Sequence, residues 1–232
     1  MSAKKGTVVD LFSGAGGLSL GFSNAGFTPI FAADFDPFAC ATYARNLGSH
    51  VAQLDLKELS ASELRARVLR SARRPDVVAG GPPCQGFSIQ RRGGRDDQRN
   101  DMVVKFAELA VTLQPRVIVM ENVPTLLGER GRTHLERAVR IWEAAGYSAV
   151  SRVLDAADYG VAQARRRAFV VAVHHSVGTE FAFPVATHAD RRATVRDALA
   201  GLPEPRDDFT DHPRYANHKR VKMSKANIER IA

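Results

Sequence analysis

The chain has 232 residues, of which 44% are hydrophobic, so it can bury the core of one large domain and is not expected to be disordered. Its 33 Lys and Arg residues against 25 Asp and Glu residues give a net charge of +8, which favours a polyanionic partner such as nucleic acid. The two cysteines, Cys40 and Cys84, lack the paired His spacing of a zinc site and do not form a disulfide framework, so no metal is expected. The first residues do not match a signal peptide, and no apolar run approaches the roughly 20 residues that a membrane span needs, so we expect a cytoplasmic protein.

A strand, a glycine turn and a helix open the chain. Residues 7–12 are rich in β-branched side chains and predict a strand, and residues 13–17 follow at once with a cluster of glycines. A helix is expected from there to about residue 26. This order is typical of a nucleotide-binding unit, because glycines let a ligand approach the backbone and a helix N-terminus offers unpaired N–H groups. A plain tight turn would give the same pattern.

The second strand, residues 28–33, ends at a pair of acidic residues. Asp34 follows Gly14 by 20 residues, close to the spacing at which an acidic residue binds ribose hydroxyls. We assign Asp34 to a ligand, with Phe35 as a surface on which a flat base can stack. Asp36 stands directly before a proline and is instead expected to cap the next helix, in which Cys40 is a core residue.

The next two predicted strands also end near polar side chains. Residues 51–54 lead to Asp55, which either binds an exocyclic amine or is an ordinary surface residue. Residues 60–63 match a capping box and predict a helix that runs to about residue 73. The apolar residues 76–79 form the fourth strand.

The loop after the fourth strand presents Cys84 behind two glycines and two prolines. Paired prolines stiffen the backbone, and a stiff loop at a strand end can hold a reactive side chain out of the core. A turn with a buried, inert thiol is the alternative at this point. Residues 89–100 continue the loop with four arginines, which suits a basic lid over a phosphate backbone or a disordered surface loop.

Residues 116–120 predict the fifth strand of the sheet. They form an apolar run typical of a central parallel strand, and the run ends at Glu121. A helix with a mostly core-facing stripe precedes it, over residues 101–113. Residues 149–154 and 168–173 predict the last two strands. Ligands of open α/β sheets bind outside the carboxyl ends of the strands, so the side chains at these ends should gather at one edge.

Basic and polar residues stand between the last two strands. Gln163, Arg165 and Arg167 alternate along the chain and would point the same way if this segment is extended. Such a set of donors suits phosphate or base binding, and a solvated basic turn is the alternative. After residue 186 the pattern loosens, with a short helix expected over 194–202. We therefore divide the chain into a core, residues 1–186, and a basic extension, residues 187–232.

With these residues in view, the chain resembles the DNA (cytosine-5)-methyltransferases. Four segments carry the resemblance in the family's order: residues 10–17 (DLFSGAGG), 81–88 (GPPCQGFS), 121–123 (ENV) and 163–167 (QARRR). Residues 194–199 and 227–231 are similar to the region before the family's target recognition domain. The resemblance implies a Rossmann-like methyltransferase fold, an α/β architecture with a seven-stranded, mostly parallel sheet and helices on both faces.

The resemblance also implies a mechanism and its residues. Cys84 would add to C6 of a cytosine flipped out of double-stranded DNA, and a methyl group would pass from S-adenosylmethionine to C5, leaving S-adenosylhomocysteine. Glu121 would contact the base, assisted by Arg165 and Arg167. Ser88, Arg99 and Gln163 would contact DNA. The cofactor site would be lined by Phe12, Gly14, Gly16, Asp34, Phe35, Asp55, Leu56, Pro83 and Met102.

The chain departs from the family's pattern at three positions near these motifs. The family usually has Glu where Asp34 stands, Pro where Ala162 stands and Asn where Asp155 stands. A larger departure is the absence of the family's target recognition domain and closing motifs. We expect one subunit of a two-chain enzyme, or a fragment of a longer one, with a second polypeptide supplying base recognition. An RNA cytosine methyltransferase and an inactive remnant that binds DNA or cofactor are the alternatives.

Overall fold

The computed structural model describes residues 6–70, 74–83, 101–215 and 217–224, together with residues 227 and 229. The chain separates into two compact units, Met1–Arg192 and Ala193–Ala232. Each unit is described by itself. In the part of the chain covered by these residues, no helix is both long and apolar enough to cross a membrane.

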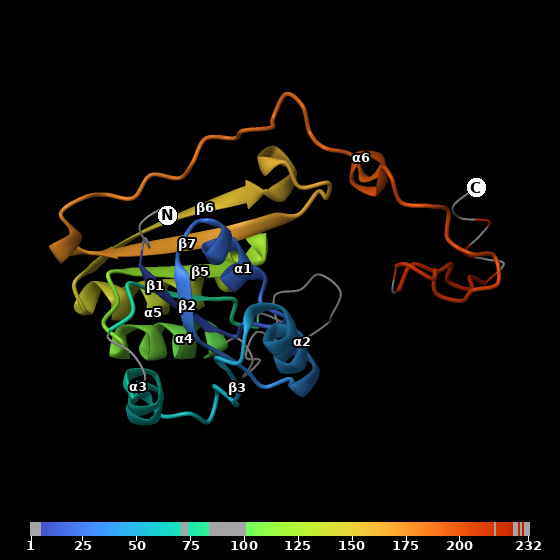
Figure 1. Ribbon diagram of the computed structural model, residues 1–232. Coiled ribbons are helices and arrows are strands. Elements are labelled where there is room, and N and C mark those ends of the chain that lie inside the picture. Colours follow the sequence, from blue (N-terminus) through green and yellow to red (C-terminus); the bar gives the residue numbers. More distant parts are fainter. Residues whose placement is uncertain are drawn as a thin grey trace. The chain divides into compact units, whose positions relative to one another are not determined.

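A seven-stranded sheet forms the centre of the first unit, which confirms the expected architecture (Figure 1). The strand order is β3-β2-β1-β4-β5-β7-β6, and β7 is antiparallel to both of its neighbours while the other pairs are parallel. The strands are β1 (Thr7–Leu11), β2 (Thr28–Asp34), β3 (Val51–Gln53), β4 (Val77–Gly80), β5 (Val117–Asn122), β6 (Tyr147–Asp155) and β7 (Arg166–His174).

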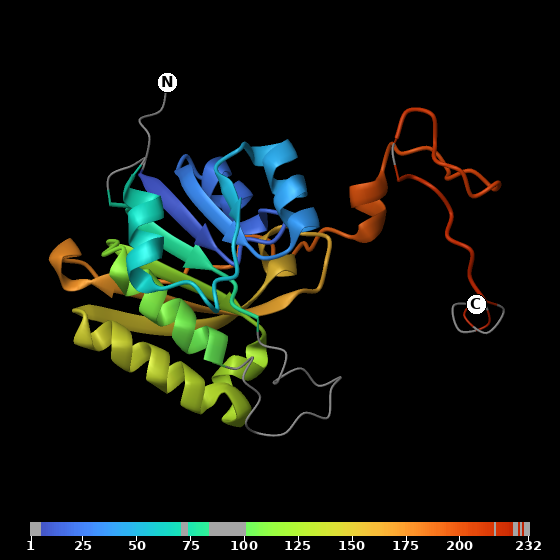
Figure 2. The same cartoon turned by 90° about the horizontal axis from the view of Figure 1, so that it is seen from below.

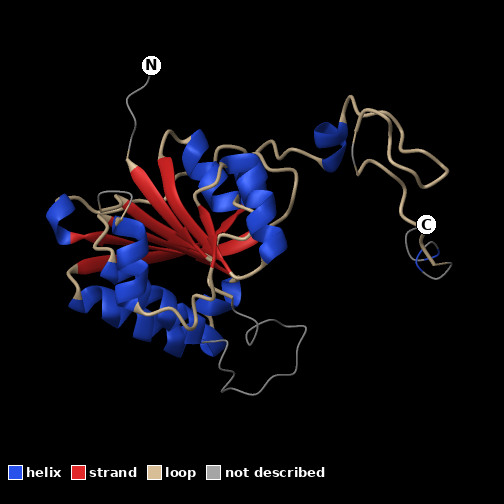
Figure 3. Cartoon of the chain, turned by 60° about the horizontal axis from the view of Figure 1, so that its bottom comes forward, coloured by secondary structure: helices blue, strands red, loops and turns tan. Residues whose placement is uncertain are grey.

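Helices cover both faces of this sheet (Figures 2 and 3). Those of the first unit are α1 (Gly17–Asn24), α2 (Pro37–Leu47), α3 (Ala61–Leu69), α4 (Asp101–Thr112) and α5 (Glu129–Ala144), with short 3-10 helices η3 (Pro124–Leu127), η4 (Ala156–Tyr159) and η5 (His175–Val177). The second unit contains α6 (Val195–Leu199). The capping box predicted for α3 is confirmed, since the Ser60 and Glu63 side chains each bond to the other residue's backbone N–H.

The core has two layers because strand side chains alternate between the faces of the sheet. Val9 and Leu11 of β1 belong to the larger cluster, with residues of α3, α4 and α5 such as Phe106 and Trp142. Val8 of β1 belongs to a smaller cluster on the other face, against which Phe22 of α1 packs. Strand β4 is buried along its whole length, which explains its unbroken apolar run.

Several element boundaries differ from the sequence expectations. Strand β5 continues through Glu121 and Asn122, so these residues lie inside the strand rather than after it. Strands β6 and β7 pair from Tyr147↔His174 to Asp155↔Arg166, which is longer than predicted because polar residues also take part in the ladder. Helix α6 is shorter than the predicted helix over 194–202.

Candidate active site

The strand ends meet at one edge of the sheet, as expected. Strands β1, β2, β4 and β5 run parallel, so the residues after their carboxyl ends lie along the same edge. Strand β7 runs in the opposite direction and therefore brings its first residues, Arg166 and Arg167, to this edge. The candidate site is built from these loops.

The loop after β1 makes a tight turn beneath this edge. Phe12 and Gly14 both have left-handed backbone conformations, with φ of 59° and 54°. The Gly14 backbone N–H donates to Oδ2 of Asp34 over 2.8 Å, so the ends of β1 and β2 are tied together. Gly16 also has positive φ, and a Cβ there would lie 2.8 Å from the Tyr43 ring, so no other residue fits without a shift.

Asp34 and Asp36 divide their roles at the end of β2. Asp34 accepts from Gly14 through Oδ2 and from the Asp36 N–H through Oδ1, and each oxygen keeps a further lone pair for a ligand. The Asp36 side chain accepts from the N–H groups of Phe38 and Ala39, which confirms that it caps α2. Phe35 lies between the two acids and is 70% exposed, so its ring is free to stack on a flat group.

The other residues expected at the cofactor differ in their access to solvent. Asp55 and Pro83 are exposed, and Oδ1 of Asp55 accepts from the Lys57 N–H. Leu56 is 2% exposed and belongs to the larger core cluster, and Met102 at the start of α4 is also buried. Cys40 is buried, as predicted for a core residue.

Glu121 and two arginines form the charged centre of the site. Nε of Arg167 lies 2.9 Å from Oε1 of Glu121, and a terminal nitrogen of Arg165 lies 3.8 Å from the same oxygen. The Glu121 side chain is 23% exposed and that of Arg165 is 49% exposed. The carboxylate is therefore held by a partly buried ion pair while one arginine remains free to reach outward.

The backbone that leads to Cys84 passes beside Glu121. A Cβ placed on Gly81 would lie 3.4 Å from Oε2 of Glu121. The buried Asn122 side chain donates to the carbonyl of Pro82 over 3.0 Å and accepts from the Val123 N–H through its oxygen. Asn122 thus fixes the loop entrance, a role that the sequence predictions missed. Its position directly after Glu121 in a strand end was the available signal.

The remaining predicted site residues lie partly outside the described segments. Cys84, Ser88 and Arg99 fall within residues 84–100, which the structure does not describe. Gln163 is exposed in the loop between β6 and β7, so the predicted alternation with the two arginines does not extend over one regular strand. In the described residues, no group of three or more His, Cys, Asp or Glu side chains could hold a metal ion.

A buried polar chain beneath the glycine loop was not predicted. Oδ2 of Asp10 accepts from the N–H and the hydroxyl of Ser19, and the Tyr43 hydroxyl donates to Ser19 over 2.8 Å. Because the single Tyr43 hydrogen is used there, Nε2 of His50 is the donor across its 2.9 Å contact with Tyr43. Burial raises the pKa of Asp10 to about 7, while the Ser19 hydrogen bonds act in the opposite direction.

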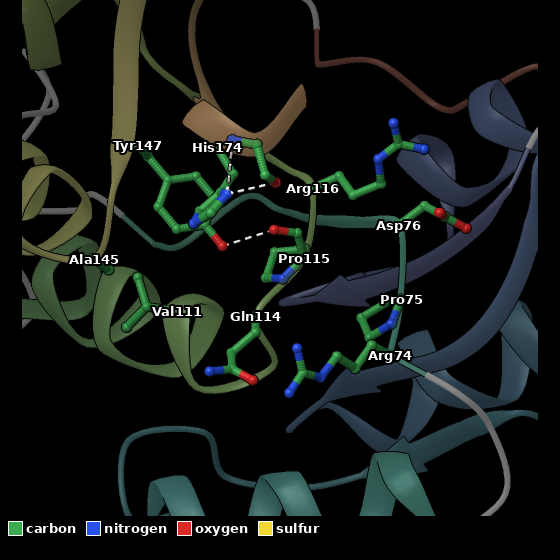
Figure 4. Close-up of a pocket in the computed structure, with 11 residues that line it drawn as sticks. Arg74, Pro75, Asp76, Val111, Gln114, Pro115, Arg116, Ala145, Tyr147 and His174 are labelled. Atoms are coloured by element: carbon green, nitrogen blue, oxygen red, sulfur yellow. Dashed lines mark hydrogen bonds between the residues drawn. The ribbon is translucent and has the colours of Figure 1, made fainter. Parts of the chain in front are cut away.

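A pocket of about 620 Å³ lies at the opposite edge of the sheet (Figure 4). Its walls come from residues before β4 and β5, such as Asp76 and Arg116, and from Tyr147 and His174 at the far ends of β6 and β7. The Tyr147 hydroxyl donates to the Pro115 carbonyl over 2.7 Å across this pocket. None of the predicted site residues lines it, so the candidate active site remains at the other edge.

A family model described as C-5 cytosine-specific DNA methylase matches residues 6–231. The chain is 38% identical to Type II methyltransferase M1.HphI of Haemophilus parahaemolyticus, over 97% of this chain and 60% of that relative. It is 33% identical to Type II methyltransferase M.AquIA of Picosynechococcus sp., over 84% of this chain and 88% of that relative. Seven of the curated relatives are covered over only 46–64% of their own length.

Solved structures agree with the sheet topology. A putative DNA modification methyltransferase encoded within an E. coli prophage superimposes with a TM-score of 0.75 at 35% identity, over 85% of this chain and 55% of that one. The S. pombe Dnmt2 methyltransferase matches with a TM-score of 0.64 at 21% identity, a likeness of fold alone. The strand order and these neighbours identify the Rossmann-like methyltransferase fold.

Proposed function

Because the chain belongs to the C-5 cytosine-specific DNA methylase family, we propose that it transfers a methyl group to C5 of a cytosine in DNA. The observation that carries this proposal is the contact of Glu121 with Arg165 and Arg167 beside the backbone that leads to Cys84. A carboxylate flanked by guanidinium groups at a sheet edge can bind the polar edge of a base and balance charge that develops on it.

Cys84 is the proposed nucleophile. Its thiolate forms a bond to C6 of the cytosine, and the C5–C6 π electrons move to C5, which becomes able to take up a methyl group. C5 would then bond to the methyl carbon as the methyl–sulfur bond breaks and its electron pair stays on sulfur. A base such as water would remove the C5 proton, and the electrons of that C–H bond would restore the double bond and expel the thiolate. A free thiol is only a few per cent thiolate at neutral pH, so the positive charge of Arg165 or Arg167 would favour the reactive form.

The cofactor of this family is S-adenosylmethionine, which supplies a methyl group bound to a positively charged sulfur and is left as S-adenosylhomocysteine. The residues at the ends of β1 and β2 fit it. A Cβ at Gly14 would meet nothing within 4 Å, which leaves room for a ligand against the backbone, and the buried Ser13 hydroxyl has no partner among the described residues. Asp34 would accept the ribose hydroxyls and the exposed Phe35 would stack on the adenine. The cofactor-lining set also includes Phe12, Gly16, Asp55, Leu56, Pro83 and Met102.

The target cytosine must leave the DNA stack, because no protein side chain can reach C6 inside a base-paired duplex. We propose that Ser88, Arg99 and Gln163 contact the DNA around the flipped base. The exposed position of Gln163, at the same edge as Arg165, supports this assignment. The net charge of +8 supports DNA as the partner.

A second polypeptide is proposed to complete base recognition. We assign catalysis to residues 1–186, and residues 187–232 lead toward the recognition domain. Supporting this, apolar side chains of the second unit are well exposed, among them Val195 at 62% and Val221 at 75%. None of that unit's described residues belongs to either hydrophobic cluster.

Replacing Cys84 by Ser tests the proposed reaction. Transfer of labelled methyl groups from S-adenosylmethionine to duplex DNA, in the presence of the second polypeptide, should fall below detection, because a hydroxyl is a far weaker nucleophile than a thiolate. Cofactor binding, measured by calorimetry, should be unchanged. The buried Cys40→Ser variant is the matched control and should keep its activity. Undiminished methyl transfer by the Cys84→Ser variant would refute the assignment of Cys84 as the nucleophile. Methyl transfer by the unaltered chain to tRNA instead of duplex DNA would refute DNA as the substrate.

A further inference from the structure

Arg165 has to be positioned by its backbone, because its side chain is only loosely held. It is the last residue of the loop between β6 and β7, and its terminal nitrogen is 3.8 Å from Glu121 while Arg167, inside the strand, makes the 2.9 Å contact. Half of the Arg165 side chain is exposed. A long side chain on an unrestrained loop would lose much conformational freedom on binding a base, and a fixed backbone reduces that loss.

Asp155 provides this restraint from the end of β6. Its Oδ1 accepts from the Arg165 N–H over 3.1 Å and from the Ala157 N–H over 3.2 Å, so one carboxylate oxygen joins the first turn of the loop to its last residue. The Ala156 N–H donates to the Arg165 carbonyl over 3.0 Å. Both backbone polar groups of Arg165 are therefore bound to residues 155–156, and the Asp155 side chain is only 16% exposed.

Arg192 holds the outer oxygen of the same carboxylate. Its guanidinium lies 4.0 Å from Oδ2 of Asp155 and 2.5 Å from Oδ1 of Asp158. The segment that carries Arg192 is itself bound to the loop, since the N–H groups of Thr187 and His188 donate to the Asp158 carbonyl. Asp155 thus has one oxygen on backbone donors and the other facing a cation, which fixes its orientation.

We propose that Asp155 is a positioning residue of the methyl transfer, which sets the backbone of Arg165 so that its guanidinium meets the base beside Glu121. Arg192 acts on Asp155 and not on the base. This inference rests on the proposed function of Arg165. Arg167 needs no such restraint, because it is already fixed by its pairing with Leu154 in the β6–β7 ladder.

The first test measures the Arg165 amide directly. Amide hydrogen exchange, followed by NMR, should be at least tenfold faster at Arg165 in the Asp155→Ala variant, because its N–H acceptor is lost. Asp155→Asn should keep the protection, since the amide oxygen still accepts. Asp158→Ala is the matched control, because it removes an Arg192 partner and leaves the Arg165 bond. Unchanged exchange in Asp155→Ala would overturn the proposal without reference to activity.

The second test links this bond to the reaction. With the second polypeptide present, Asp155→Ala should lower kcat for methyl transfer about tenfold with KM for S-adenosylmethionine unchanged, and Asp155→Asn should recover most of the rate. On an Arg165→Ala background the Asp155→Ala change should cost nothing further. Full additivity of the two losses would contradict positioning through Arg165. Undiminished activity of Arg165→Ala alone would instead contradict the proposed function.

Discussion

Asp10 carries a carboxylate that is fully enclosed beneath the glycine loop. Ser19 donates two hydrogen bonds to Oδ2, whereas Oδ1 has no partner among the described residues. Burial disfavours the ionised form and, with a smaller contribution from the nearby Asp34 charge, raises the pKa from 3.8 to about 7. The pKa of the carboxyl beneath the glycine loop therefore lies far closer to neutral pH than that of an exposed Asp.

A raised pKa makes stability depend on pH in a defined direction. The folded chain binds the Asp10 proton more tightly than the unfolded chain, so this contribution to the unfolding free energy is complete below about pH 4 and is lost as the pH rises through about 7. Asp10→Asn cannot titrate and should lack this decline. Urea unfolding at several pH values should show the difference between wild type and variant changing by about 4 kcal/mol at most. Parallel pH profiles for the two proteins would contradict the assignment.

At the residue scale, the sequence located side chains with a local signature and missed those whose partners are distant. Asp36 could be predicted as a cap because a proline and a helix follow it directly. The hydrogen-bond chain of Asp10 gave no signal, since Ser19, Tyr43 and His50 are brought together only by folding. Asp155 was visible as an unusual residue, but its contacts with Arg165 and Arg192 depend on the loop conformation.

At the scale of elements, the close approach of α5 to η3 is the most demanding contact. Gly131 in the first turn of α5 is buried against the backbone of Leu126, and a Cβ there would lie 2.5 Å from the Leu126 carbonyl oxygen. Backbone atoms cannot move aside as a flexible side chain can. The helix must therefore shift away from η3 if any side chain is added at this position.

Gly131→Ala should accordingly lower the free energy of unfolding by about 1–3 kcal/mol, the usual effect of overpacking. Gly21→Ala is the matched control, because Gly21 is exposed inside α1 and a Cβ there meets nothing within 4 Å. Alanine favours a helix interior by roughly 0.5–1 kcal/mol over glycine, so this variant should be slightly stabilised. Chemical denaturation measures both, and equal stability of the two variants would show that α5 can move freely.

The sequence predicted which strands and helices form, but it did not predict the residues at which several of them begin and end. The alternation from strands to amphipathic helices identified every strand of the sheet, and the Ser60–Glu63 pair fixed the start of α3. The β6–β7 hairpin is longer than expected because polar residues just outside the predicted strands, such as Ser148, Asp155 and Arg166, also pair across the ladder. The hydrophobic pattern of a sequence indicates which side chains are buried. Backbone hydrogen bonding at the edge of a sheet does not require buried side chains, so the pattern does not show where such strands end.

At the scale of the whole molecule, the sequence predicted a mostly parallel sheet but not where the antiparallel strand lies. An apolar strand has the same pattern in either direction, so the insertion of β7 between β5 and β6 is decided by tertiary packing. The second unit is different in kind. Its apolar side chains, such as Leu199 and Met223, are more than half exposed, and it contributes nothing to either core cluster among its described residues.

Adding the proposed second polypeptide should therefore change activity. The chain alone should transfer few methyl groups to duplex DNA, and mixing it with the polypeptide that carries the recognition domain should restore sequence-specific transfer. Replacing Val195 and Leu199 together by Asp should weaken this restoration at least tenfold, measured as the concentration of partner that gives half-maximal rate. Asp replacements of the exposed Leu20 and Val150 are controls in the first unit. Full, site-specific methylation by the chain alone would contradict the two-chain proposal.

Because β7 runs antiparallel to β5, Arg165 and Arg167 differ in how far their positions depend on the length of the β6–β7 loop. Arg167 is fixed by strand register, one position beyond the Asn122↔Ala168 pair, so its distance from Glu121 is insensitive to the length of the loop that precedes it. Arg165 belongs to that loop and moves with it. The length of the β6–β7 loop is therefore not constrained by the contact of Glu121 with Arg167, whereas Arg165 depends on the hydrogen bonds that tie its backbone to Asp155 and Ala156.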